Sequence, residues 1–157
     1  MYANASGNPI SRKDPLGLYV QFIGGNPVST AQLIAAYNQV ASTSAGAAWI
    51  NTLENSPILY TILDNPLFPN DAYFDPINNI IDVDPNFHHH VATSCGVQQA
   101  STAVILAHEL AHAATGALDN GPDFMANVIQ DENLIRPQLG LPPRTAYPTP
   151  APFLPGN

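Results

Sequence analysis

Two histidines four residues apart, with a glutamate after the first, are the side chains in this chain most able to do chemistry. They are His108, Glu109 and His112, in the sequence His-Glu-Leu-Ala-His. On a helix with 3.6 residues per turn, the two imidazoles lie one above the other and can reach one metal ion. Glu109 lies about 100° around that helix, where it can take a proton from a bound water molecule without binding the metal. The pattern predicts zinc-dependent hydrolysis, most directly of peptides.

The residues around this motif predict the helix that it needs. No proline occurs between Gly96 and Gly116, and Gly116 is a natural C-terminal stop. Apolar residues recur at helical spacing, at Val104, Ile105, Leu106, Leu110, Ala111 and Ala114. Two histidines buried on such a helix need partners. Metal binding supplies them, and the alternative is a pair of core histidines hydrogen-bonded to neighbouring groups.

A catalytic zinc ion takes three protein ligands and leaves one position for water, so a third ligand is expected. Glu132 lies about twenty residues after the second histidine, the usual place for a glutamate that completes the site from a second helix. The segment from Pro122 to Arg136 predicts that helix, with Pro137 as its stop. Asp119 and Asp123 remain alternative third ligands.

Three consecutive histidines, His88, His89 and His90, form a second cluster. They follow Asp84-Pro85, which predicts a solvated loop. Side chains of consecutive residues point in different directions and rarely converge on one ion. We therefore interpret the triplet as part of a loop, with a place near the zinc as the alternative.

Length and composition predict a single acidic domain. The 157 residues suit one core of ordinary size. The net charge is -8 and the pI is about 4.6, which argues against a nucleic-acid partner. The single cysteine, Cys95, allows no internal disulfide and is expected to be structural. The sequence has no apolar run of membrane-spanning length and no evident signal peptide, so we expect no membrane partner. A monomer is also expected.

The N-terminal segment, residues 1–18, resembles the end of the core domain of Rhs/YD-repeat proteins. The matching residues are Tyr2-Ala3-Asn4 and Gly7-Asn8-Pro9-Ile10-Ser11-Arg12-Lys13-Asp14-Pro15-Leu16-Gly17-Leu18. The resemblance implies a repeat shell around a C-terminal toxin and an aspartyl self-cleavage, here after Leu18. Asp14 belongs to that motif, but the upstream half of the protease site is missing, so we expect no self-cleavage. Release after Leu18 would remove two basic residues and one acid, changing the net charge from -8 to -9.

The segment from about residue 27 to 147 resembles the NleD-like effector metallopeptidases. The resemblance rests on Leu106-Ala107-His108-Glu109-Leu110-Ala111-His112-Ala113, on Asp131-Glu132-Asn133-Leu134-Ile135-Arg136, and on Leu139-Gly140-Leu141-Pro142-Pro143-Arg144-Thr145-Ala146-Tyr147. It implies a zinc endopeptidase with Glu132 as the third ligand. Pro137 departs from the family pattern and is expected to shorten the second helix without disturbing that ligand.

Arg144 and Tyr147 follow the second helix and could fold back over the metal. A guanidinium group or a phenol near the scissile carbonyl would stabilise the oxyanion that develops as water attacks. The alternative is that Arg144 pairs with an acid and Tyr147 packs in a loop.

The remaining segments predict an α+β scaffold of the zincin type. Helices are expected from Ser29 or Thr30 to Val40 and from about Ala45 to Glu54. Strands are expected at 58–63, 72–74 and 77–83, forming a small sheet of about three strands beside the motif helix, with an edge strand that aligns the substrate. The predicted organisation is the Rhs junction at 1–18, the enzyme domain at 19–147 and a proline-rich tail at 148–157.

These observations predict a zinc endopeptidase that is the toxin domain of an Rhs-type carrier, secreted and delivered to the cytosol of a target cell. The expected partners are a protein or peptide substrate, the Rhs shell before release and a cognate immunity protein. One alternative function is a zinc amidase that acts on cell-wall peptides. Another is a binding module with structural zinc, which is disfavoured because Glu109 is present and a fourth histidine or cysteine ligand is not well placed.

Overall fold

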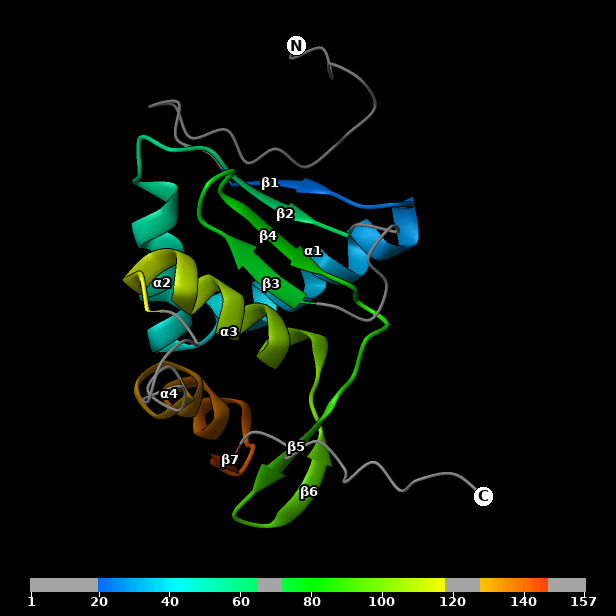
Figure 1. Cartoon of the computed structure of the whole chain (residues 1–157), viewed down its shortest axis with the longest axis vertical. Helices are drawn as coiled ribbons and strands as arrows, with labels where there is room; N and C mark the ends of the chain where they lie inside the picture. The colour runs from blue at the N-terminus through cyan, green and yellow to red at the C-terminus, as the bar shows by residue number, and fades with distance from the viewer. Residues whose placement is uncertain (1–19, 65–71, 118–127, 147–157) are drawn as a thin grey trace, which may run out of the picture.

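A four-stranded sheet forms the upper half of the molecule in the computed structural model, which describes residues 20–64, 72–117 and 128–146 (Figure 1). Its strands are β1 (Val20–Ile23), β2 (Tyr60–Leu63), β3 (Ala72–Asp75) and β4 (Ile80–Val83). The order is β1-β2-β4-β3, in which β1, β2 and β4 are parallel and β3 is antiparallel to β4. In β1 and β2, alternate residues are buried, as expected for strands with one face against a core.

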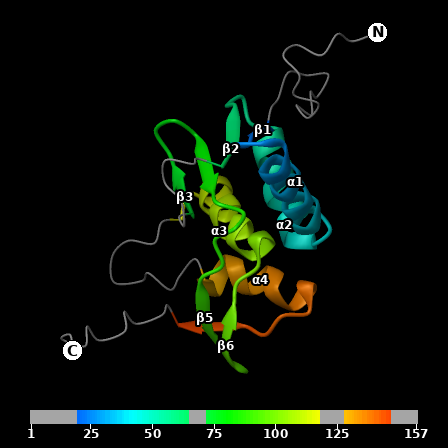
Figure 2. The same cartoon turned by 90° about the vertical axis from the view of Figure 1, so that its right-hand side faces the viewer.

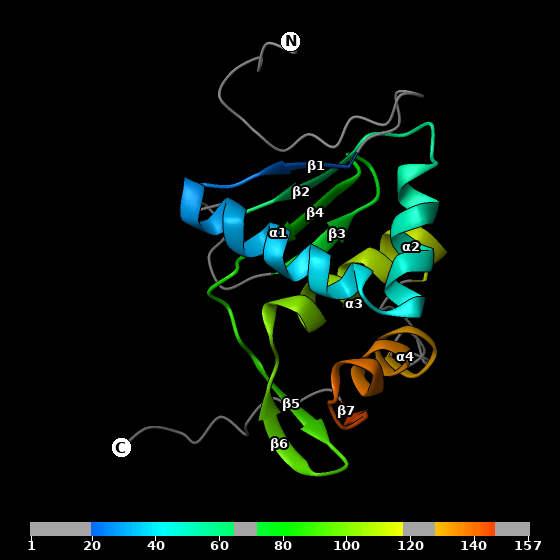
Figure 3. The ribbon, with the colours of Figure 1, turned by 180° about the vertical axis from the view of Figure 1, so that it is seen from behind.

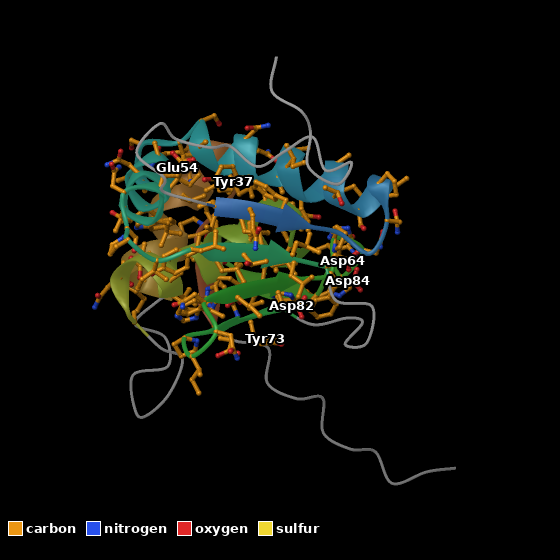
Figure 4. All side chains as sticks on the ribbon, turned by 90° about the horizontal axis from the view of Figure 1, so that it is seen from above. Tyr37, Glu54, Asp64, Tyr73, Asp82 and Asp84 are labelled. Atoms are coloured by element: carbon orange, nitrogen blue, oxygen red, sulfur yellow. The ribbon has the colours of Figure 1, made fainter. Side chains whose placement is uncertain are left out.

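Two helices contact this sheet, and a third, the second in the chain, packs against both of them. They are α1 (Pro27–Ala41), α2 (Ser44–Glu54) and α3 (Thr102–Thr115). Asn26 and Ser29 form a capping box at the start of α1, which runs across the sheet in Figure 3. The Tyr37 hydroxyl donates to Glu54 Oε1 at 3.0 Å and so joins α1 to α2 (Figure 4). The core between these elements includes the fully buried Leu33, Val40, Leu53, Ile62, Ile81, Leu106 and Leu110.

Helix α3 is the most enclosed of these helices, since every residue from Ala103 to His112 is buried. It contacts α1, α2, β3 and β4. The hydroxyl of Ser101 accepts a hydrogen bond at the N-terminus, and the helix ends at Gly116, whose left-handed φ of 75° suits glycine. The motif residues therefore stand on a helix that the core holds in place.

A second, smaller layer lies on the other side of α3 (Figure 2). It contains the sheet β6-β5-β7, formed by β5 (His90–Thr93), β6 (Gly96–Gln99) and β7 (Arg144–Ala146). The π-helical turn η2 (Val128–Glu132), the short helix α4 (Asn133–Ile135) and the 3-10 turn η3 (Arg136–Leu139) follow one another and pack beside it. Within the described residues, no helix is long and apolar enough to span a membrane.

The structure confirms the mixed α+β architecture and its main elements. The predicted helices correspond to α1, α2 and α3, and the predicted strands to β2, β3 and β4. The predicted strand at 77–83 is shorter, because 76–79 form a turn before β4. The predicted helix at 122–136 lies partly outside the described residues, as do the junction at 1–18 and the tail at 148–157.

Several expectations were wrong in detail. Residues 96–99 form β6, a strand that the sequence analysis did not predict, and His90 begins β5 and does not lie in a loop. The sheet beside α3 has four strands, because Val20–Ile23 pairs with β2. The α-helical part of the second helix ends at Ile135, just before Pro137 as predicted, and a 3-10 turn follows it to Leu139. Proline is tolerated there because it stands in the first turn of η3, where its missing N–H leaves no bond unmade.

Candidate metal centre

The two motif histidines meet through the same ring nitrogen. Nε2 of His112 lies 3.2 Å from Nε2 of His108, and the two rings are almost perpendicular, with centroids 4.7 Å apart. Both residues are buried, at 8% exposure for His108 and 6% for His112. Their four-residue separation on α3 thus brings the nitrogens together as the sequence predicts.

The other nitrogen of His112 is held by the end of its own helix. Nδ1 of His112 contacts the backbone carbonyl of Ala117 at hydrogen-bond distance. Ala117 follows Gly116, whose left-handed conformation turns the chain back toward the helix. Because the partner is a carbonyl oxygen, Nδ1 carries the proton and Nε2 has the lone pair.

The other nitrogen of His108 faces a carboxylate. Nδ1 of His108 lies 3.3 Å from Oε2 of Glu132. A carboxylate oxygen only accepts hydrogen bonds, so the proton of this ring is favoured on Nδ1 and the lone pair on Nε2. In both histidines, therefore, the nitrogen that faces the other ring is the basic one.

Two lone pairs at this distance repel each other unless a cation lies between them. Two nitrogens bound tetrahedrally to zinc at 2.0–2.1 Å would be about 3.3–3.4 Å apart, close to the 3.2 Å between the imidazoles. A histidine whose Nδ1–H is held by an oxygen while Nε2 faces the ion is also the arrangement of metal-ligating histidines. The two residues fit a zinc ion, although no group of three histidine, cysteine or acidic side chains close enough to hold a metal occurs in the parts of the chain that the structure describes.

Glu132 is the most heavily paired acid of the centre. It is 1% exposed, and its carboxylate accepts hydrogen bonds from Nη1 of Arg136 at 3.0 Å and from Nη1 of Arg144 at 2.7 Å. Burial alone would raise the pKa of Glu132, but the hydrogen bond to His108 and the charge and hydrogen bond of Arg144 outweigh it and lower the pKa. The carboxylate is ionised at neutral pH. Its direct binding to the metal stays a prediction.

Asp131 is a second buried acid beside the histidines, and the sequence reasoning missed it. It is 7% exposed, and burial raises its pKa while the charges of His112 and His108 act in the opposite direction. Two adjacent acids both face inward at the end of the π-helical turn η2. The sequence did contain a signal for Asp131, namely its place next to Glu132. Only Glu132 was selected, because a glutamate about twenty residues after the second histidine is the usual third ligand.

His89 lies within the electrostatic influence of Arg144, Glu132 and His108. A place near the metal was the alternative that the sequence left open for the histidine triplet. Burial lowers the pKa of His89, Arg144 and His108 lower it further, and Glu132 raises it. Its Nδ1 is buried without a hydrogen bond among the described residues. His88 is held apart, with Nδ1 at 3.1 Å from the carbonyl of Ala100, and His90 is exposed.

The other predicted site residues are placed as follows. Glu109 is buried on α3 directly after His108, at 6% exposure. Arg144 is buried on β7, where its guanidinium contacts Glu132 and the carbonyl of Ala146. Its pairing with an acid is the alternative that the sequence allowed, and its catalytic role stays a prediction. Tyr147, Asp119 and Asp123 lie outside the described residues.

The comparisons with known proteins concern the fold. The chain shares its fold with a zinc metalloprotease effector. The crystal structure of the Salmonella zinc metalloprotease effector GtgA matches with a TM-score of 0.53 at 16% sequence identity, covering 80% of this chain and 73% of that chain. No protein-family model matches the sequence, and no curated protein matches it.

Proposed function

We propose that this chain is a zinc-dependent endopeptidase of the effector type. The observation that carries the proposal is the pair of Nε2 atoms that face each other 3.2 Å apart on a buried helix. Zinc bound there would polarise a substrate carbonyl and acidify a water molecule. The fold shared with a zinc metalloprotease effector supports the proposal.

The proposal gives each side chain of the centre a separate role in metal binding or proton transfer. His108 and His112 hold the metal through Nε2, and one of the two adjacent buried acids, Asp131 or Glu132, is the candidate for the third ligand. Glu109 takes the proton of the attacking water and passes it to the leaving amine. The proposal that Arg144 and Tyr147 stabilise the developing oxyanion rests on the sequence alone.

The delivery of the enzyme is a proposal of its own. The Rhs-like junction at 1–18 supports a toxin domain that is carried in a repeat shell, cut after Leu18 and restrained by an immunity protein in the producing cell. The fold shared with GtgA, a zinc metalloprotease effector, supports secretion into a target cell. The alignment of a substrate by an edge strand of the sheet beside α3 is also kept as a proposal.

The test is Glu109→Gln in the full chain, with Glu54→Gln as the matched control. Glu54 is the only glutamate outside the centre, and it accepts a hydrogen bond from Tyr37 that glutamine can still accept. We expect one zinc per chain in all three proteins by elemental analysis. Peptide cleavage and growth inhibition in a bacterial cytosol should fall by at least about 100-fold in Glu109→Gln alone, the size of a general-base contribution. A Glu109→Gln protein that cleaves peptides as fast as the wild type would contradict the assignment of Glu109 as the general base.

The same experiment separates the other two functions. A cell-wall amidase would inhibit growth only when exported to the periplasm, because its substrate lies outside the cytosol. A structural zinc module would bind zinc and show no activity in any compartment, with the metal in a closed site of four protein ligands.

A further inference from the structure

The carboxylate of Glu132 is fully engaged by three side chains. Arg136 donates to Oε1 at 3.0 Å, and Arg144 donates to Oε2 at 2.7 Å. Oε2 also lies 3.3 Å from Nδ1 of His108. Glu132 and Arg136 are 1% exposed and Arg144 is 5% exposed. This arrangement resists rearrangement, because removing any one partner leaves a buried charge unpaired.

The two arginines are also fixed to the backbone around them. Nε of Arg136 donates to the carbonyl of Pro142 at 2.7 Å. The backbone of Arg144 donates to Oδ1 of Asn133 at 2.7 Å and accepts from Nδ2 of the same side chain at 2.9 Å. Arg136 and Arg144 are the only basic residues that follow Lys13. Both arginines donate hydrogen bonds to the carboxylate of Glu132, so contacts with Glu132 hold the segment 132–144 together.

The position of Glu132 relative to His108 decides what it can do. Nδ1 and Nε2 of an imidazole point away from each other, and Nε2 of His108 is the atom that faces His112. Glu132 lies at Nδ1, on the opposite side of the ring. To reach an ion between the two Nε2 atoms, its carboxylate would have to leave His108 and at least one arginine.

We propose that Glu132 is a positioning residue that holds the Nδ1–H group of His108 and so aims Nε2 at the metal, while Arg136 and Arg144 hold the carboxylate. This inference rests on the proposed zinc site and replaces the predicted role of Glu132 as a ligand. A carboxylate in this position fixes the tautomer and the orientation of the ring, and its loss typically lowers metal affinity about 10- to 100-fold.

The test measures metal binding by the full chain and does not depend on activity. Zinc affinity is measured by competition with a chromophoric chelator, and the ligand set by the visible absorption of the cobalt-substituted protein. We expect Glu132→Gln to bind zinc about 10- to 100-fold more weakly than the wild type, with unchanged cobalt band positions. Glu109→Gln, which removes a neighbouring buried carboxylate, is the control and should keep both the affinity and the bands.

A second variant protects the test against misfolding of Glu132→Gln. Arg144→Met removes a guanidinium that cannot bind metal, so weaker zinc binding with unchanged cobalt bands is expected here too. The Nδ1 proton of His108 in the zinc-bound protein should shift upfield in the nuclear magnetic resonance spectrum of both variants. Shifted cobalt bands in Glu132→Gln would make Glu132 a ligand, and wild-type affinity in both variants would also overturn the positioning role. A wild type that binds neither metal overturns the zinc site itself.

Discussion

Three histidines near the centre differ in what surrounds their ring nitrogens. Nδ1 of His108 faces a carboxylate and Nδ1 of His112 faces a carbonyl, which leaves Nε2 of each ring basic. His89 has a buried Nδ1 with no hydrogen bond in the described part of the chain. The partners of a ring, and not its presence in a motif, thus decide whether it can bind a metal.

The lowered pKa of His89 predicts how the free energy of unfolding changes at acidic pH. Burial, followed by the charge of Arg144, lowers its pKa in the folded protein. Since the unfolded residue has a pKa of about 6.5, the unfolded chain binds the proton more readily, and stability is lost as the pH falls below that value. We expect His89→Gln to lose less unfolding free energy than the wild type between pH 7.5 and 5.5 in urea titrations of metal-free protein. His90→Gln, at the exposed neighbour, should follow the wild type, and equal losses in all three proteins would contradict this account.

At the scale of the elements, the C-terminal end of α3 contributes to the geometry of the two histidines as well as the helix itself does. Gly116 adopts a left-handed conformation, and the turn that it makes returns the carbonyl of Ala117 to His112. The π-helical turn η2 similarly ends with Asp131 and Glu132 both buried. Single π-helical turns of this kind are frequent at functional sites.

We predict that Gly116→Ala weakens metal binding in addition to stability. A residue with a Cβ atom costs about 1 kcal/mol in the left-handed region, so the turn would relax and release Nδ1 of His112. Gly96→Ala is the matched control, because Gly96 also has a positive φ, of 96°, with open space around it, but belongs to the hairpin β5–β6. Both variants should unfold at lower urea concentrations, and only Gly116→Ala should need more zinc for half-saturation. Equal zinc affinities would show that the turn does not support the ligand.

Much of the fold could be predicted from the sequence, because α1, α2 and α3 carry periodic apolar residues and visible end signals, such as Gly116. The His-Glu-Leu-Ala-His pattern likewise placed two imidazoles together. The hairpin β5–β6 was missed because Gly96–Gln99 is a short, mostly exposed strand without apolar alternation. Arg136 stands four residues after Glu132, the spacing of an ion pair on one helix face, so the sequence carried a signal for this contact that was missed.

At the scale of the whole molecule, the centre lies inside the core. Helix α3 contacts both α1 and α2, the sheet above it and the turn η2 below it. The centre therefore gathers Glu109, Asp131 and Glu132, the two arginines and two facing imidazoles in a place that water reaches poorly. A cation between the imidazoles would stabilise the arrangement of all these groups, so we expect metal binding and folding to be coupled.

This coupling predicts a metal-dependent melting temperature. Zinc at 100 times its Kd stabilises a protein by about 2.7 kcal/mol, which corresponds to a rise of about 5–11 °C for a domain of this size. We expect a chelator to lower the melting temperature of the wild type by this amount in calorimetry, and added zinc to restore it. His112→Asn lacks a ligand and should respond to neither, and a wild type insensitive to both treatments would separate the metal from the fold.

The pairing of Arg136 and Arg144 with Glu132 would affect how long the proposed effector persists in a target cell. Lys13 is the only lysine in the sequence, and release after Leu18 would remove it. The remaining chain would have no ε-amine for lysine-directed ubiquitin ligases. Trypsin-like proteases would find one arginine buried on β7 and another followed by Pro137, a bond that they cut poorly. Because Arg136 and Arg144 are both buried against Glu132, they would be poorly accessible to proteases that cut after basic residues.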